Sequence, residues 1–190
     1  MTPFWRAADP VDASAASEQG SLRHAVARSE GRRERRTARG RWRAMAVLAA
    51  AAFAVDQIAK WAVRQTIGGG EDWVHAGGLA IGHNRNDGIA FGLFAGSGRV
   101  VGLATAILLP ALALALGLLA RGGIMAALAG GLLLGGSTSN LVDRLVRGEV
   151  TDYIEVGLWP AFNLADVAIV CGAGLVIWVV GCRDERSDSK

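Results

Sequence analysis

The chain has 190 residues, of which 52% are hydrophobic and only 19% are charged, and this composition argues against an ordinary soluble domain. The formal net charge of +3 arises in the first 43 residues, which hold 10 Arg and 5 acidic residues, while the remainder is close to neutral. Cys171 and Cys182 lie in one apolar segment, too far apart along a helix for a bond between them, so a disulfide framework is excluded.

Residues 1–43 are rich in Ala, Ser, Glu and Arg and have no apolar periodicity, which predicts a disordered basic tail. The Arg cluster over residues 31–43 could bind nucleic acid. A basic stretch directly before an apolar segment is more typical of the positive-inside signal, which keeps that end of the chain in the cytoplasm. The apolar run starts too late and continues too long for a cleaved signal peptide. We therefore expect no nucleic-acid partner.

Four apolar stretches follow, each about as long as the ~20 residues that cross a hydrocarbon core as a helix. They are residues 44–63, 100–120, 122–142 and 161–182. These stretches predict a mainly α membrane protein with four transmembrane helices, a membrane domain over residues 44–182 and a short cytoplasmic tail over residues 183–190. With the basic tail inside, an even number of spans places both termini in the cytoplasm and the loops 64–99 and 143–160 on the outer face.

The polar residues of these segments converge on one level, near the outer face. They are Asp56, Lys60, Asn140, Asp143, Asp152, Asn163 and Asp166. Ionisable groups in a membrane segment are costly, so they point to a functional site facing the interior of the bundle.

Local spacing leaves two interpretations open for several of these residues. Asp56 and Lys60 are four residues apart, so they could form a structural ion pair or take part in chemistry. Asn140, Asp143 and Arg144 share a helix face and could cap the helix end near lipid headgroups, but we favour a role in supporting the site.

The first outer loop carries weaker signals. Asn86-Asp-Gly88 is a strong turn signal, and a plain β-turn explains it if it stands alone. Residues 71–83 contain a Gly pair and are consistent with a small hairpin. His75 and His83 have no Cys or carboxylate at ligand spacing, so we expect solvated histidines and no metal.

Asp152 and Asp166 are the best candidates for chemistry. Asp152 lies in the alternating, extended segment 149–154 and Asp166 lies one turn into the fourth helix, on the same face as Asn163. If the loop folds back over the bundle, the two carboxylates can meet and hold a single shared proton. The ionised member could then activate water while the protonated member binds a substrate carbonyl. No Ser or Cys nucleophile with a paired His is evident.

Five sequence blocks together resemble the lipoprotein signal peptidases (signal peptidase II). They are, in order, Asp56-Gln-Ile-Ala-Lys60, Asn86-Asp-Gly-Ile-Ala-Phe91, Gly135-Gly-Ser-Thr-Ser-Asn-Leu-Val-Asp-Arg144, Gly148-Glu-Val-Thr-Asp-Tyr153 and Phe162-Asn-Leu-Ala-Asp166. The resemblance implies an aspartyl endopeptidase of the bacterial inner membrane that removes signal peptides from prolipoproteins, cutting before a diacylglyceryl-modified cysteine. It also implies a small extracytoplasmic β-cradle between helices one and two.

The resemblance implies that Asp152 and Asp166 form the catalytic pair, with water as nucleophile and no cofactor. It implies supporting or substrate-binding roles for Asp56, Lys60, Asn86, Gly88, Asn140, Asp143, Arg144 and Asn163. The expected partners are a lipid-modified prolipoprotein and membrane lipids, and we expect a monomer. This chain departs from the family pattern at Ser139, where Gly is usual, and at Thr151 and Tyr153, where apolar residues are commoner.

Two other functions remain open at this stage. A small proton-coupled transporter could use Asp56, Lys60 and Asp166 as a relay, although the central halves of helices two and three carry no ionisable group. A structural scaffold could bind partners through the Arg-rich tail, and deletion of residues 1–40 would separate that function from an enzyme.

Overall fold

The structure is a computed structural model that describes the backbone of residues 10–68, 72–88 and 97–188. Its elements are α1 (Pro10–Thr66), β1 (Asp72–Ala76), β2 (Leu79–Asn86), α2 (Gly98–Ala120), α3 (Ile124–Arg147), β3 (Val150–Val156), β4 (Trp159–Phe162) and α4 (Leu164–Asp188). The chain divides into two compact units, the first ending at Gly40 and the second beginning at Arg41.

The described part of the first unit is helical, which differs from the expected disordered tail over residues 1–43. The reason lies in composition, because Ala, Arg and Glu are strong helix formers even where no apolar face is present. Residues 41–43 belong to the second unit. At the other end of the chain, α4 continues to Asp188, so most of the expected tail over residues 183–190 is also helical.

Four helices are long and apolar enough to cross a membrane: Val26–Thr66, Gly98–Ala120, Ile124–Arg147 and Leu164–Cys182. Each contains or closely overlaps one of the four predicted spans. Pro110 lies inside α2 without ending the helix. This confirms the prediction of a four-helix membrane fold.

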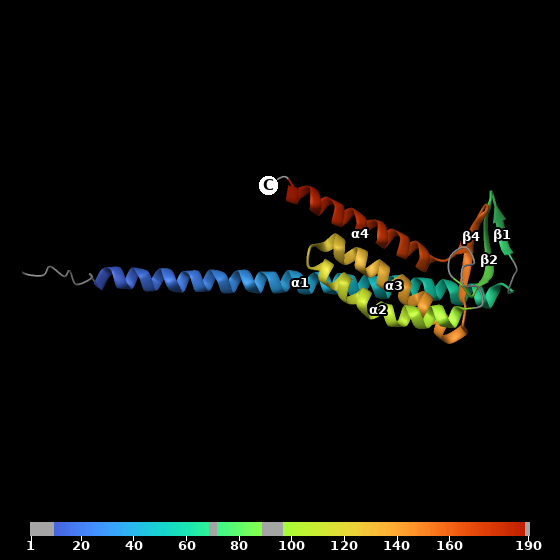
Figure 1. Cartoon of the computed structure of the whole chain (residues 1–190), viewed down its shortest axis with the longest axis horizontal. Helices are drawn as coiled ribbons and strands as arrows, with labels where there is room; N and C mark the ends of the chain where they lie inside the picture. The colour runs from blue at the N-terminus through green and yellow to red at the C-terminus, as the bar shows by residue number, and fades with distance from the viewer. Residues whose placement is uncertain (1–9, 69–71, 89–96, 189–190) are drawn as a thin grey trace, which may run out of the picture. The chain divides into compact units, whose positions relative to one another are not determined.

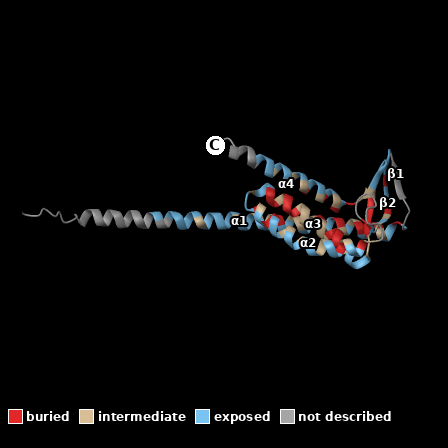
Figure 2. Cartoon of the chain, viewed as in Figure 1, coloured by how far each residue is buried: buried red, intermediate tan, exposed pale blue. Residues whose placement is uncertain are grey.

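The third helix is the centre of the second unit, and buried residues gather along it (Figure 2). Its glycines allow close approach of two neighbours: a Cβ on Gly135 would lie 2.5 Å from the carbonyl oxygen of Ala49 in α1. A Cβ on Gly136 would lie 2.4 Å from the carbonyl oxygen of Ala165 in α4. Small residues are what such helix contacts need in lipid. The glycines of α3 therefore set the spacing of the bundle.

The four strands form one antiparallel sheet in the order β1-β2-β3-β4, at one end of the helices of this unit (Figure 1). Gly77 and Gly78, with φ of +58° and +86°, form the tight turn between β1 and β2. This hairpin lies between α1 and α2, as predicted for the β-cradle. The sheet is larger than expected, because β3 and β4 from the second loop extend it.

The pairing of β2 with β3 brings together residues far apart in the sequence. Asn84 lies opposite Asp152, and Asn86 lies opposite Val150. Asn86 and Asp152 are thus diagonal neighbours on one face of the sheet. At the end of α3, Gly148 adopts a left-handed conformation with φ of +80° and donates its N–H to the carbonyl of Arg144 at 3.0 Å. This cap turns the chain from α3 directly into β3.

Candidate active site

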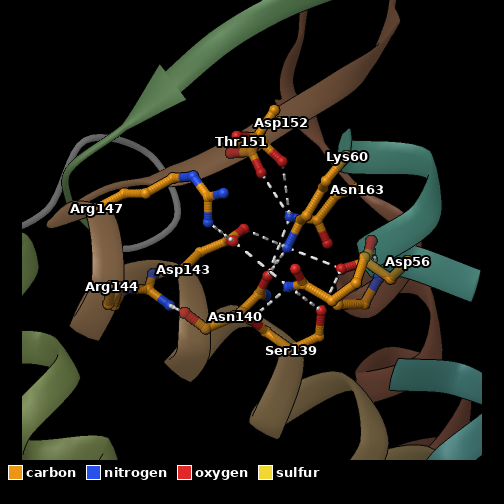
Figure 3. Close-up of polar contacts among 12 residues, drawn as sticks. Asp56, Lys60, Ser139, Asn140, Asp143, Arg144, Arg147, Thr151, Asp152 and Asn163 are labelled. Atoms are coloured by element: carbon orange, nitrogen blue, oxygen red, sulfur yellow. Dashed lines mark hydrogen bonds and ion pairs between the residues drawn. The ribbon is translucent and has the colours of Figure 1, made fainter. Parts of the chain in front are cut away.

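A buried ion-pair cluster links α1 to α3 at the end of the bundle that carries the sheet (Figure 3). The Lys60 ammonium lies 2.8 Å from Asp56 Oδ2 and 3.0 Å from Asp143 Oδ2, and all three side chains are completely buried. Asp56 and Lys60 thus form the ion pair that their spacing allows. Asp143 is not placed to bind headgroups, because it too faces the interior.

Lys60 also fixes the orientation of a neighbouring amide. Its Nζ donates to Asn140 Oδ1 at 2.6 Å, which turns the Asn140 amide so that Nδ2 donates to Asp166 Oδ1 at 2.8 Å. The opposite orientation would direct an NH₂ group at a buried ammonium. The Asn140 amide therefore connects the Lys60 ammonium to the Asp166 carboxylate through two hydrogen bonds.

Asp166 occupies the first turn of α4 through a capping arrangement with Asn163, the residue just before the helix. The Asp166 N–H donates to Asn163 Oδ1 at 3.0 Å, and the Asn163 N–H donates to Asp166 Oδ2 at 3.2 Å. This reciprocal pair is a capping box, so the local sequence Asn-Leu-Ala-Asp specifies where the carboxylate lies. The helix N-terminus and these N–H donors favour a negative charge on Asp166.

Asp152 accepts amide donors on both oxygens. Asn86 Nδ2 donates to Oδ2 at 2.8 Å and Asn163 Nδ2 donates to Oδ1 at 2.7 Å. Since the backbone N–H of Asn163 donates to Asp166 Oδ2, one residue donates to both carboxylates. Burial raises the pKa of Asp152 from its ordinary value to about 6, and the nearby charge of Asp166 adds to this effect. The hydrogen bonds from Asn86 and Asn163 act in the opposite direction.

Asn86 both forms the local turn that the sequence predicts and contacts the candidate site. Asn86 Oδ1 accepts the Gly88 N–H at 3.0 Å, which makes a local turn, while Nδ2 of the same amide holds Asp152. The Gly88 carbonyl accepts a hydrogen bond from Arg144 Nη2 at 2.9 Å. The rest of this sequence block, residues 89–91, lies outside the described residues.

The two carboxylates line a common cavity of about 720 Å³. Its polar side carries Asn86, Gly88, Asn140, Arg144, Asp152 and Asp166. Its apolar side is formed by Val101 of α2, Phe162 of β4, and Ile169 and Val170 of α4. Val170 is 71% exposed on the outer surface of the helix bundle. The cavity thus places two carboxylates beside a surface that is apolar enough for lipid.

Some contributors to the site were missed by sequence reasoning. Ser139 Oγ donates to Asp56 Oδ2 at 2.6 Å, and Tyr153 Oη donates to Asp56 Oδ1 at 3.3 Å. Arg64 Nη1 donates to the hydroxyl of Thr151 at 3.1 Å. Arg64 continues the i, i+4 spacing of Asp56 and Lys60, so the helical period could have found it. No comparable spacing in the sequence indicates that Ser139 and Tyr153 contact Asp56.

His83 differs from the expectation of a solvated side chain. His83 is buried, and its Nδ1 lies 3.0 Å from the Ile67 carbonyl oxygen, so it packs against the end of α1. The side chain of His75 lies outside the described residues. Within the described ranges, no group of three or more His, Cys, Asp or Glu side chains is arranged to hold a metal ion.

The fold and site together define a multi-pass membrane protein with a carboxylate-lined cavity at one end of its helix bundle. Residues 48–181 match the family model of signal peptidase (SPase) II. The chain is 36% identical to the lipoprotein signal peptidase of Mesorhizobium japonicum, over 78% of this chain and 93% of that one. Identity to that of Shouchella clausii is 35%, over 74% of this chain and 97% of that one. The chain therefore belongs to the signal peptidase II family and is a peptidase.

A solved structure of a bacterial membrane enzyme has the same fold. It superposes with a TM-score of 0.68 at 28% sequence identity, covering 77% of this chain and 91% of that one. A second structure of a bacterial membrane enzyme gives a TM-score of 0.61, also at 28% identity. The residues of the site lie within the segment that the family model covers.

Proposed function

We propose that Asp152 and Asp166 form an aspartyl pair that cuts signal peptides from prolipoproteins, directly before a diacylglyceryl-modified cysteine. The observation that carries this proposal is that both carboxylates line one cavity and both accept hydrogen bonds from Asn163, Asp152 from its side-chain amide and Asp166 from its backbone N–H. A pair of carboxylates in a partly desolvated cavity can hold a single shared proton between its members. A third carboxylate, Asp87, also lines the cavity, but its side chain is exposed, whereas Asp152 and Asp166 both accept hydrogen bonds from Asn163.

The environments of the two residues favour different roles. Burial raises the pKa of Asp152, so we assign it as the member that carries the shared proton and donates a hydrogen bond to the scissile carbonyl. Asp166, which accepts the Asn163 backbone N–H at the start of its own helix and the Asn140 amide of α3, is then the ionised member that removes a proton from water. Attack of that water on the carbonyl gives a tetrahedral intermediate, and the proton passes to the leaving amine.

The apolar side of the cavity suits the proposed substrate. A signal peptide is an apolar helix, and the lipid attached just beyond the cut needs a path from the bilayer. The side chains of Val101, Ile169 and Val170 offer such a path between α2 and α4. We further propose that this end of the bundle faces the outer leaflet, with both termini in the cytoplasm, because the basic segment precedes α1's apolar part.

The distribution of buried charge does not favour a proton-coupled transporter. In the described part of the chain, the buried Asp and Lys side chains are Asp56, Lys60, Asp143 and Asp152, and all lie in the cluster near the sheet. The opposite half of α3 packs Ala126, Ala127 and Ala129 instead. A proton path across the bilayer needs ionisable groups along its length.

The experiment is incubation of the purified protein with a diacylglyceryl-modified precursor and with the same precursor lacking the lipid. Mass spectrometry of the products should map a single cut before the modified cysteine, and the unmodified precursor should be cut at least tenfold more slowly. Equal cleavage of both precursors, or a cut at another bond, would overturn the proposed specificity.

A further inference from the structure

Two hydroxyl groups that the sequence marks as departures from the family pattern meet at the same buried carboxylate. Ser139 Oγ donates to Asp56 Oδ2 at 2.6 Å, and Tyr153 Oη donates to Asp56 Oδ1 at 3.3 Å. Ser139 comes from α3 and Tyr153 from β3, so the carboxylate on α1 is held from two sides. Asp56 and Ser139 are completely buried, and Tyr153 is 6% exposed. No solvent can replace either hydroxyl without opening the bundle.

Asp56 and Tyr153 in turn hold the beginning of α4. The Ala165 N–H donates to Asp56 Oδ1 at 3.0 Å, and the Leu164 N–H donates to Tyr153 Oη at 3.2 Å. The first N–H groups of a helix have no partner within the helix, so they need acceptors from elsewhere when they are buried. These two acceptors fix the two residues directly before Asp166.

Tyr153 has a special position because it follows Asp152 in the chain. Its backbone belongs to the strand that carries one carboxylate, and its phenol oxygen binds the helix that carries the other. The Tyr153 ring packs against Val63 in α1 and against Ile67 just after the end of α1, and this packing limits the motion of the ring. Burial, followed by the charge of Asp56, raises the pKa of the phenol, so it stays protonated and remains a donor.

We propose that Tyr153 and Ser139 are positioning residues for peptide hydrolysis, which hold Asp56 and thereby fix the first turn of α4, with Asp166, relative to Asp152. This inference rests on the proposed function, because it assumes that Asp152 and Asp166 are the reacting pair. Neither hydroxyl reaches the reacting bond. Both act by keeping the two carboxylates within reach of one water molecule, and misplacement by about 1 Å can slow a reaction ~100-fold.

Removal of each hydroxyl, with minimal change of shape, tests this inference. Tyr153→Phe leaves the Leu164 N–H without its acceptor, and Ser139→Ala removes the donor to Asp56 Oδ2. The measurement is the single-turnover rate constant on a lipid-modified precursor, together with the precursor concentration that gives half the maximal rate. Thr66→Val is the matched control, since that exposed hydroxyl bonds only to the Ala62 carbonyl of its own helix.

The positioning role predicts that Tyr153→Phe lowers the rate constant about tenfold and Ser139→Ala about threefold, with the half-saturating concentration within twofold of wild type. The double variant should lose less than the product of the single losses, because both hydroxyls act through Asp56. The control should keep its rate constant. If Tyr153→Phe does not fold, Ser139→Ala, which removes one atom, decides the question.

A purely structural role gives a different result, in which the melting temperature falls while the rate constant of the folded protein is unchanged. That result, or a change confined to the half-saturating concentration, would overturn the inference. Asp166→Asn measured in parallel separates the two proposals. If Asp166→Asn remains active, the proposed function fails; if it is inactive while both hydroxyl variants react at the wild-type rate, only the positioning role fails.

Discussion

Lys60 is the cation at the centre of the buried cluster, and Lys60→Met tests whether its ammonium compensates the buried charges of Asp56 and Asp143. Met keeps most of the length of the side chain but removes the ammonium that lies 2.8 Å from Asp56 and 3.0 Å from Asp143. Breaking a buried ion pair by removing one partner destabilises a protein by about 3 to 5 kcal/mol, because the remaining charge stays buried without compensation. For a chain of this size, that corresponds to a fall in Tm of about 6 to 20 °C.

The assay is thermal unfolding in detergent, followed by tryptophan fluorescence, with Arg147→Met as the matched control. Arg147 also pairs with Asp143, at 3.3 Å, but its side chain is 38% exposed. Removing this partly solvated partner should cost less than about 1 kcal/mol. A Tm for Lys60→Met within 2 °C of that of the control would refute the interpretation of Lys60 as the compensating charge.

Three further predictions follow from individual contacts. Gly136→Ala should destabilise the bundle by about 1 to 3 kcal/mol, measured as a fall in Tm, because the new Cβ would lie 2.4 Å from the Ala165 carbonyl oxygen. Gly174→Ala is the control and should leave Tm unchanged, since its new Cβ would meet nothing within 4 Å. Asp152→Asn should raise the free energy of unfolding by up to about 3 kcal/mol at pH 8 and leave it unchanged at pH 4. The reason is that the pKa of Asp152 is raised to about 6 in the folded protein, so the wild type loses stability as the pH rises through that value. An equal effect of the substitution at both pH values would refute the raised pKa of Asp152. Asn163→Ala should lower stability by about 1 to 2 kcal/mol through loss of the cap, and abolish precursor cleavage as well; a variant that loses stability but keeps its activity would show that Asn163 only caps the helix.

Much of the fold could be predicted from hydropathy, because each span is a local feature of the sequence. The four apolar stretches became the four candidate membrane helices, and the extended segment at residues 149–154 became β3. The pairing of β2 with β3 could not be predicted, because it joins Asn86 to Val150 across a whole helix hairpin. In the described part of the first unit, residues 10–40 are helical where we expected disorder, because Ala, Arg and Glu favour a helix even without an apolar face.

The site was predictable where spacing along one helix determines contact. The i, i+4 relation of Asp56 and Lys60 predicted their ion pair, and the shared face of Asn163 and Asp166 became a capping box. The role of Ser139 was not predictable in this way, because its partner Asp56 is 83 residues away in the chain. Contacts between helices depend on the rotation of each helix about its axis, which packing against the α3 glycines sets.

In the proposed mechanism, Asp152 and Asp166 act together on one peptide bond. The most direct measurement is the cleavage rate of a lipid-modified precursor by Asp152→Asn and Asp166→Asn, with Glu155→Gln as the control. Glu155 lies three residues beyond Asp152 on β3 and is bonded to Asn84. Each Asp variant should lose at least about 1000-fold in rate while the control stays within threefold of wild type. Cleavage by either Asp variant at a rate close to that of the control would contradict the claim.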